Sequence, residues 1–218
     1  MITLYGRPFT ILVLYFLVFG VFANTNPLDN LVEAYNDGRY DKTFDYFLNQ
    51  AQKGNVEAQN IVGLFYNEGL GTDQNFEQAL FWYRKSAQRG HLGAQNNLGS
   101  MYEEGLGIKR DYRRAMHWYL RAAAKGNVLA QDNVGLMYER GQGVTPTLST
   151  AALWYRKAAN GGYAPSQFRL GMMYEQGNGF KKSVSDAVFW YRKATDQGHH
   201  AASERLQRLE ALGFHYVH

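Results

Sequence analysis

The side chains best suited to metal binding are the histidines, four of which lie near the C-terminus. His199 and His200 are adjacent, and His215 and His218 are three residues apart. Closely spaced imidazoles bind zinc when carboxylates or thiolates complete the ligand set. The chain has no cysteine, and no metal motif places an acidic residue with these histidines. We therefore expect no metal and no other cofactor, and a frayed C-terminal tail.

Catalytic constellations are also missing from the sequence. Nucleophilic catalysis needs a serine, threonine or cysteine held beside a base. No recognised motif contains a serine–lysine pair or a serine–histidine–acid set, and no motif brings two carboxylates together. The sequence therefore predicts a protein that is not an enzyme.

Positive charge has two patterns along the chain. Basic pairs such as Arg156-Lys157 recur near the ends of predicted helices, where cations favour the helix macrodipole and face solvent. A tighter cluster, Lys109–Arg114 around Asp111, departs from this pattern, and its role stays open. The net charge of +4 is too small to predict binding to nucleic acid.

An uncharged apolar run, residues 9–23, follows Arg7 near the start of the chain. The run is shorter than the roughly 20 residues that a membrane-spanning helix needs. Val21 and Ala23 stand at the small-residue positions of a cleavage site. Residues 1–23 are therefore predicted to be a secretory signal peptide. The mature protein would be periplasmic or secreted, without stable membrane insertion, although an uncleaved anchor remains an alternative.

A period of 36 residues organises most of the remaining chain. It is marked by the tryptophans, each followed by tyrosine: Trp82, Trp118, Trp154 and Trp190. It also holds for a glycine and a tyrosine of each unit: Gly63, Gly99, Gly135 and Gly171, with Tyr66, Tyr102, Tyr138 and Tyr174. Four such units follow one another without an insertion, which predicts a repeat protein.

Each unit predicts two helices. The first extends from about Ala58 to Glu68 and ends at Gly69, because glycine favours the left-handed conformation that terminates helices. The second begins after an N-capping residue at the same point of every unit: Asn75, Asp111, Thr147 and Ser183. A hairpin of this size cannot bury its apolar face alone, so we expect the hairpins to stack.

The repeat has a recognisable pattern, which residues 94–129 display best: Ala94, Leu98, Gly99, Tyr102, Gly105, Gly107, Asp111, Ala115, Trp118, Tyr119, Ala122, Ala123 and Gly126. This pattern resembles the Sel-one-like repeat (SLR), a relative of the tetratricopeptide repeat (TPR), of the exported bacterial type. The resemblance covers about two-thirds of the chain. It implies an all-α fold, a right-handed α–α superhelix, or solenoid, of TPR-like helix pairs.

The repeat frame also predicts the domain boundaries. Four 36-residue repeats occupy residues 58–201: 58–93, 94–129, 130–165 and 166–201. Residues 27–57 are expected to form a degenerate TPR-like first repeat, and residues 202–218 a capping helix and tail. Gln207 and Glu210 replace the glycine and tyrosine of the repeat, which suits a last helix with no following unit.

Comparing the repeats with one another identifies a variable stripe on the first helix of each unit. Its four positions lie within an arc of about 100° at 100° per residue. The stripe comprises Asn60, Ile61, Leu64, Glu68, Asn96, Asn97, Ser100, Glu104, Asp132, Asn133, Leu136, Arg140, Phe168, Arg169, Met172 and Gln176. First helices line the concave face of TPR-like proteins, so the resemblance implies that the stripe lines a groove. Its amide and apolar side chains favour a peptide or a partner helix, with plain solvent-facing surface as the alternative.

These observations favour a non-enzymatic adaptor that binds a protein or peptide partner in its groove. The family resemblance implies cell-envelope maintenance or host-cell interaction as its settings. The main alternative is a β-lactam-binding or β-lactam-hydrolysing enzyme, as described for cysteine-rich relatives that carry a disulfide in each repeat. The absence of cysteine disfavours that alternative. A eukaryotic endoplasmic-reticulum adaptor is disfavoured too, since the chain ends in HYVH rather than a retention sequence.

Overall fold

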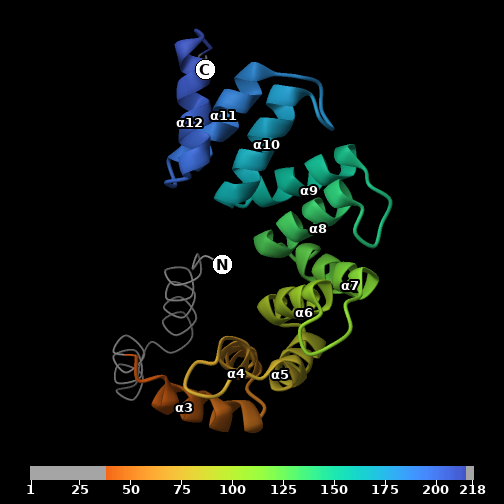
Figure 1. Cartoon of the computed structure of the whole chain (residues 1–218), viewed down its shortest axis with the longest axis vertical. Coiled ribbons are helices and arrows are strands. Elements are labelled where there is room, and N and C mark those ends of the chain that lie inside the picture. The colour runs from red at the N-terminus through yellow and green to blue at the C-terminus, as the bar shows by residue number, and fades with distance from the viewer. Residues whose placement is uncertain (1–37, 215–218) are drawn as a thin grey trace. The chain divides into compact units, whose positions relative to one another are not determined.

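The structure, a computed structural model, describes residues 38–214, and every regular element in that range is an α-helix (Figure 1). The helices are α3 (Tyr40–Gln52), α4 (Val56–Glu68), α5 (Phe76–Gln88), α6 (Leu92–Glu104), α7 (Tyr112–Ala123), α8 (Val128–Arg140), α9 (Leu148–Asn160), α10 (Ala164–Gln176), α11 (Val184–Thr195) and α12 (His200–Ala211). The chain divides into two compact units. The first ends at Ala79, and the second begins at Leu80. The expected signal peptide and the start of the first repeat, residues 27–37, lie outside the described residues.

In the first unit, α3 packs against α4 through aromatic side chains. The ring of Phe44 meets those of Phe65 and Tyr66 edge to face, at centroid distances of 6.0 and 5.2 Å. Phe44 and Phe47 are both buried. Residues 40–52, within the segment expected to form a first repeat, are thus helical and bury an apolar face.

In the second unit, α6 to α12 form successive hairpins that each pack on the next, as the green-to-blue ribbon of Figure 1 shows. The predicted starts of the second helices are confirmed at α5, α7, α9 and α11. Asp111 caps α7 by accepting a hydrogen bond from the Arg114 amide at 3.0 Å. Thr147 is the exception, because its hydroxyl donates to the Thr145 carbonyl oxygen instead.

The first helices begin two residues earlier than the sequence predicted, at Val56 rather than Ala58 in the first of them. The reason is a second series of N-caps. The Asn55 side chain accepts a hydrogen bond from the Ala58 amide at 2.9 Å, and His91 Nδ1 accepts one from the Ala94 amide at 2.9 Å. Histidine is not a preferred N-cap, so this series was harder to recognise than the one in the second helices.

Each hairpin of the second unit is held together by a tyrosine packed against a glycine. A Cβ atom added to Gly99 would lie 2.6 Å from the Tyr119 ring, and one on Gly135 would lie 2.6 Å from the Tyr155 ring. Both tyrosines are fully buried. The glycine inside each first helix is therefore required by the close approach of the ring.

Neighbouring hairpins are joined by a repeated hydrogen bond from a buried glutamine. In the second unit Gln95, Gln131 and Gln167 each donate through Nε2 to the carbonyl oxygen of an alanine in the preceding second helix, at 3.0 to 3.1 Å. Gln59 makes the same bond to Ala51 within the first unit, at 3.2 Å. In α12 the residue that corresponds to these glutamines is Ser203.

The array ends in α12, which packs on α11. Leu206 and Leu209 are buried against Val188 and Tyr191. Glu210, a polar replacement predicted from the sequence, accepts a hydrogen bond from Arg192 at 2.6 Å. No helix within residues 38–214 combines the length and apolar character needed to span a membrane.

Candidate functional site

Four of the sixteen stripe residues connect neighbouring first helices. Asn133 on α8 donates a hydrogen bond to the Asn96 side chain on α6 at 3.0 Å. Arg169 on α10 forms an ion pair with Asp132 on α8, with 3.6 Å between Nε and Oδ1. In both pairs, a residue of one repeat contacts a residue of the following repeat that stands one position further along the repeat. Matching between neighbours therefore explains part of the variability.

Asp132 is the most deeply buried charged member of the stripe. Its side chain is 6% exposed, and its Oδ1 accepts a hydrogen bond from the Ser166 hydroxyl at 2.6 Å. Burial raises the pKa of Asp132 above its ordinary value, although Arg169 and the Ser166 hydrogen bond oppose that shift. The guanidinium of Arg169 also lies 5.8 Å from the centre of the Tyr155 ring. These contacts make the pair a structural link between α8 and α10.

Several stripe residues that we expected to line a groove are buried inside the array: Asn60, Ile61, Asn96 and Asp132. Ile61 retains only 2% of its surface. Phe168 is half-buried and stacks on His199, with 4.7 Å between ring centres. The accessible part of the stripe is consequently narrower than the sequence suggested.

The remaining members keep solvent contact. In the first unit Leu64 is half-buried and Glu68 is exposed. On α6, Asn97 and Ser100 are half-buried, and the Ser100 hydroxyl donates to the exposed Glu104 at 2.9 Å. These positions form open surface.

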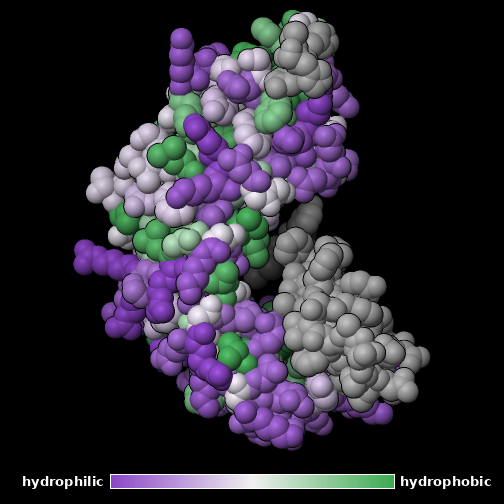
Figure 2. All heavy atoms as spheres, turned by 180° about the vertical axis from the view of Figure 1, so that it is seen from behind, coloured by the Kyte–Doolittle hydropathy of each residue, from purple (hydrophilic) through white to green (hydrophobic). Residues whose placement is uncertain are grey.

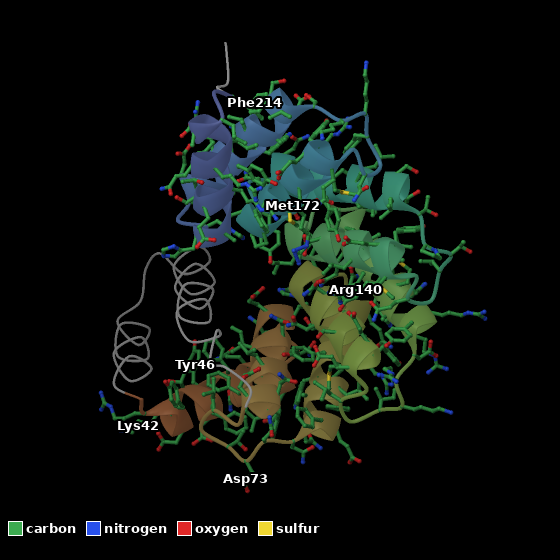
Figure 3. The ribbon with its side chains drawn as sticks, turned by 45° about the horizontal axis from the view of Figure 1, so that its top comes forward. Lys42, Tyr46, Asp73, Arg140, Met172 and Phe214 are labelled. Atoms are coloured by element: carbon green, nitrogen blue, oxygen red, sulfur yellow. The ribbon has the colours of Figure 1, made fainter. Side chains whose placement is uncertain are left out.

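A cleft of about 360 Å³ lies between α8 and α10 in the second unit. Five stripe residues line it: Leu136, Arg140, Arg169, Met172 and Gln176. Figure 3 shows Arg140 on α8 and Met172 on α10, so neighbouring hairpins supply the two walls. The sequence predicted these residues from their variability alone, and the structure brings them together around one cavity.

The sequence analysis did not identify the other walls of the cleft. Leu148, Tyr155 and Met173 add apolar surface, and Glu139 adds a carboxylate. These residues are not in the stripe, because they come from the start and middle of α9 and from positions whose type recurs between repeats. Only the folded hairpins bring them beside Leu136.

Two charged residues of the cleft differ in their availability. The Tyr155 hydroxyl donates a hydrogen bond to Glu139. Burial, together with that bond, raises the pKa of Tyr155 well above its ordinary value, so the hydroxyl stays protonated. Glu139 is thus already engaged. Arg140 is exposed and forms no ion pair with other described residues, which leaves its guanidinium available to a ligand.

The chemistry of the cleft suits the recognition of a peptide side chain. Flexible methionine and leucine side chains accept apolar groups of varied shape. An available guanidinium donates to carboxylate or backbone carbonyl oxygens. Elsewhere, the face seen in Figure 2 is a mixture of polar surface and small apolar patches.

The tryptophans differ from one repeat to another in their burial. Trp82 is buried, while Trp118, Trp154 and Trp190 are only half-buried. Cations cover some of these rings: Lys157 Nζ lies 4.0 Å from the centre of the Trp154 ring. The tryptophans thus belong partly to the outer surface of the second helices.

Two of the described histidines have structural roles. His91 and His199 cap α6 and α12 through Nδ1. Within residues 38–214, no group of three or more histidine, aspartate or glutamate side chains is arranged to hold a metal ion. His215 and His218 lie outside the described residues.

Comparison with known proteins identifies the repeat. The family model described as "Sel1 repeat" matches residues 56–91, 93–127, 128–163 and 164–199. No curated protein matches the chain. Among solved structures, a Sel1 repeat protein from Oxalobacter formigenes is similar, with 31% identity and a TM-score of 0.78 over 85% of this chain and 76% of the other.

Two further solved structures extend the comparison. A protective antigen present in uropathogenic Escherichia coli strains, with an SLR fold, shares 28% identity at a TM-score of 0.77. The match covers 95% of this chain but only 50% of that protein. An immunity protein from Pseudomonas aeruginosa, at 20% identity and a TM-score of 0.53 over 75% of this chain and 60% of the other, shares the fold.

The four matched repeats cover more than half of the sequence. The predicted all-α solenoid of SLR helix pairs is therefore confirmed. Such repeats form a scaffold suited to protein–protein interaction. This chain belongs to the Sel1 repeat family.

Proposed function

We propose that this protein is an exported, non-enzymatic adaptor that binds a segment of a partner protein in the cleft between α8 and α10. The observation that carries the proposal is the convergence of five variable stripe residues on one cavity. Residues that differ between repeats are free of the requirements of the shared frame. A cavity lined by such residues supports a specific role in binding rather than in folding.

The proposed partner segment presents an apolar side chain to Leu136 and Met172. Arg140, at the rim, would receive a carboxylate or a backbone carbonyl oxygen of the same segment. Open stripe positions on α6, such as Asn97 and Ser100, would extend the contact surface. The suitability of Sel1 repeats as a scaffold for protein interaction supports this arrangement.

Export is the second element of the proposal. It depends on the signal-like residues 1–23 and on their cleavage pattern. A role in envelope maintenance or host contact is consistent with the antigen of uropathogenic Escherichia coli that shares the fold. A fusion of residues 1–30 to a reporter that is active only outside the cytoplasm would test export.

Site-specific photocrosslinking in the native cell tests the binding site. One probe replaces Leu136 in the cleft, and a control probe replaces Asn160, which is exposed at the end of α9 and does not line the cleft. We expect a discrete protein adduct from position 136 only. Equal labelling at both positions, or none at 136, would contradict the proposed site.

A further inference from the structure

Positive charge is concentrated in one short stretch of the chain, residues 109–125. The stretch contains six of the 23 lysines and arginines but one of the 19 acidic residues. Because the whole chain has a net charge of +4, the rest of the chain carries no net positive charge. All six cations are exposed. The stretch is therefore a distinct basic surface.

The geometry of α7 arranges these cations in a row. Arg113 and Arg121 are eight residues apart on one side of the helix, and Lys125 follows four residues later in the turn after it. At 1.5 Å per residue the row is about 18 Å long. The single carboxylate, Asp111, caps α7 and lies 3.4 Å from Arg114. Within residues 38–214, neither Arg113 nor Lys125 forms an ion pair.

In two other second helices, the position that corresponds to His117 carries an exposed apolar side chain. Leu153 on α9, which corresponds to His117, is 52% exposed, and Phe81 on α5 is 45% exposed. A cation accompanies each aromatic ring: Arg121 lies 4.9 Å from the Trp118 ring centre, and Lys85 lies 4.4 Å from that of Phe81. The second-helix face, defined by these residues, combines cations with half-exposed aromatic groups.

We propose that the second-helix face, centred on α7, binds the surface of a membrane rich in anionic phospholipids. Guanidinium groups match the geometry of phosphate oxygens, and each cation near an anionic bilayer adds to the attraction. Aromatic side chains flanked by lysine and arginine are typical of the membrane interface, where the ring enters the headgroup layer. Leu153 and Phe81 supply the apolar contact. This binding is peripheral and does not depend on the cleft between α8 and α10.

Vesicle flotation tests this inference on the purified protein without residues 1–23. Vesicles of phosphatidylcholine alone are compared with vesicles containing one-quarter phosphatidylglycerol, at about 0.1 and 0.5 M salt, because screening weakens such attraction. The test variant reverses three charges of the row, R113E/R121E/K125E. The matched control reverses three exposed charges elsewhere, K181E/K182E/R208E. Circular dichroism of both variants verifies that they are folded.

The wild-type protein and the control are expected to float with the anionic vesicles at low salt only. The test variant should lose at least tenfold in binding. Three outcomes would overturn the inference: no binding to anionic vesicles, equal loss in both variants, or binding to an acidic polypeptide such as polyglutamate without binding to vesicles. The last result would assign the face to an acidic protein instead.

Discussion

Buried tyrosines explain why each repeat keeps a glycine in the middle of its first helix. The sequence shows that Gly135 recurs with the 36-residue period but gives no reason for it. The structure supplies the reason, because the Tyr155 ring occupies the space of a Cβ atom. A glycine inside a helix costs about 1 kcal/mol relative to alanine, so the packing must outweigh that loss.

Gly135→Ala should therefore destabilise the protein despite its better helix propensity. We expect a net loss of up to about 2 kcal/mol, because overpacking a core costs roughly 1–3 kcal/mol and the better helix propensity offsets about 1 kcal/mol of it. Thermal unfolding followed by circular dichroism measures the effect. The control is the same substitution in a Tyr155→Leu background, where the ring is gone and the loss should shrink or reverse. A loss of equal size in both backgrounds would show that the ring is not the cause.

His199 makes the stability of α12 sensitive to pH. Burial lowers the pKa of His199 below its ordinary value of 6.5, and Nδ1 accepts the capping hydrogen bond of the Ala202 amide. The unfolded chain then binds more protons than the folded one, so stability falls as the pH drops below about 6.5 towards the lowered pKa. Protonation also removes the acceptor of the cap.

His199→Asn should preserve the cap without its titration, since Asn127 performs the same role in α8. Because the variant loses the stack of His199 on Phe168, its unfolding midpoint at pH 7.5 should be slightly below that of the wild type, but it should lose less additional stability on going to pH 5. Urea titrations at the two pH values provide the comparison. An unchanged pH dependence would mean that His199 does not contribute to it.

At the scale of the helices, the N-caps determine how well the sequence predicts the boundaries. The second helices begin where predicted, because aspartate and serine are recognisable caps. The first helices begin two residues early, because histidine and tyrosine also occupy their cap positions. The cap residue of the first helices changes type from repeat to repeat, so this boundary was missed even at Asn55, which is a standard cap.

Thr147→Asp should stabilise α9. Thr147 and Asp111 have nearly the same backbone conformation, with φ of −149° and −150°, but only Asp111 accepts a capping hydrogen bond. Gaining this bond should add about 0.5–1 kcal/mol, or a few degrees in melting temperature. Ser183→Ala, which removes the cap of α11, should shift the melting temperature in the opposite direction. An unchanged melting temperature for Thr147→Asp would show that the missing cap does not limit the stability of α9.

The variable stripe could be located from the sequence. The sequence could not show which of its residues pair with a neighbouring helix and which border the cleft. A helical arc shows which residues share a side, whereas burial depends on the neighbouring helix. Asn133 meets Asn96, and Arg169 meets Asp132, so these positions vary in matched pairs. Leu136 and Met172 instead border a cavity. Telling the two groups apart requires the packing of consecutive hairpins.

For the whole molecule, the repeat period and its capping residues predict stacked helical hairpins, and the resemblance to the Sel-one-like repeat implies the solenoid that they form. Candidate binding sites are few, because the similar repeats of the array differ in their chemistry at only a few places. One is the cleft between α8 and α10, where apolar side chains adjoin the available guanidinium of Arg140. Another is the cation row on α7. Both depend on residues that depart from the shared repeat frame.

The central claim is that the cleft between α8 and α10 binds the partner protein. The most direct test is calorimetric titration of the partner captured at position 136 against Leu136→Asp, with Leu153→Asp as the control. Leu153 is an exposed leucine on α9 outside the cleft. We expect Leu136→Asp to weaken binding about 30-fold or more, as for a central interface residue, and Leu153→Asp to change it less than about threefold. Equal effects of the two substitutions, or none from Leu136→Asp, would contradict the account.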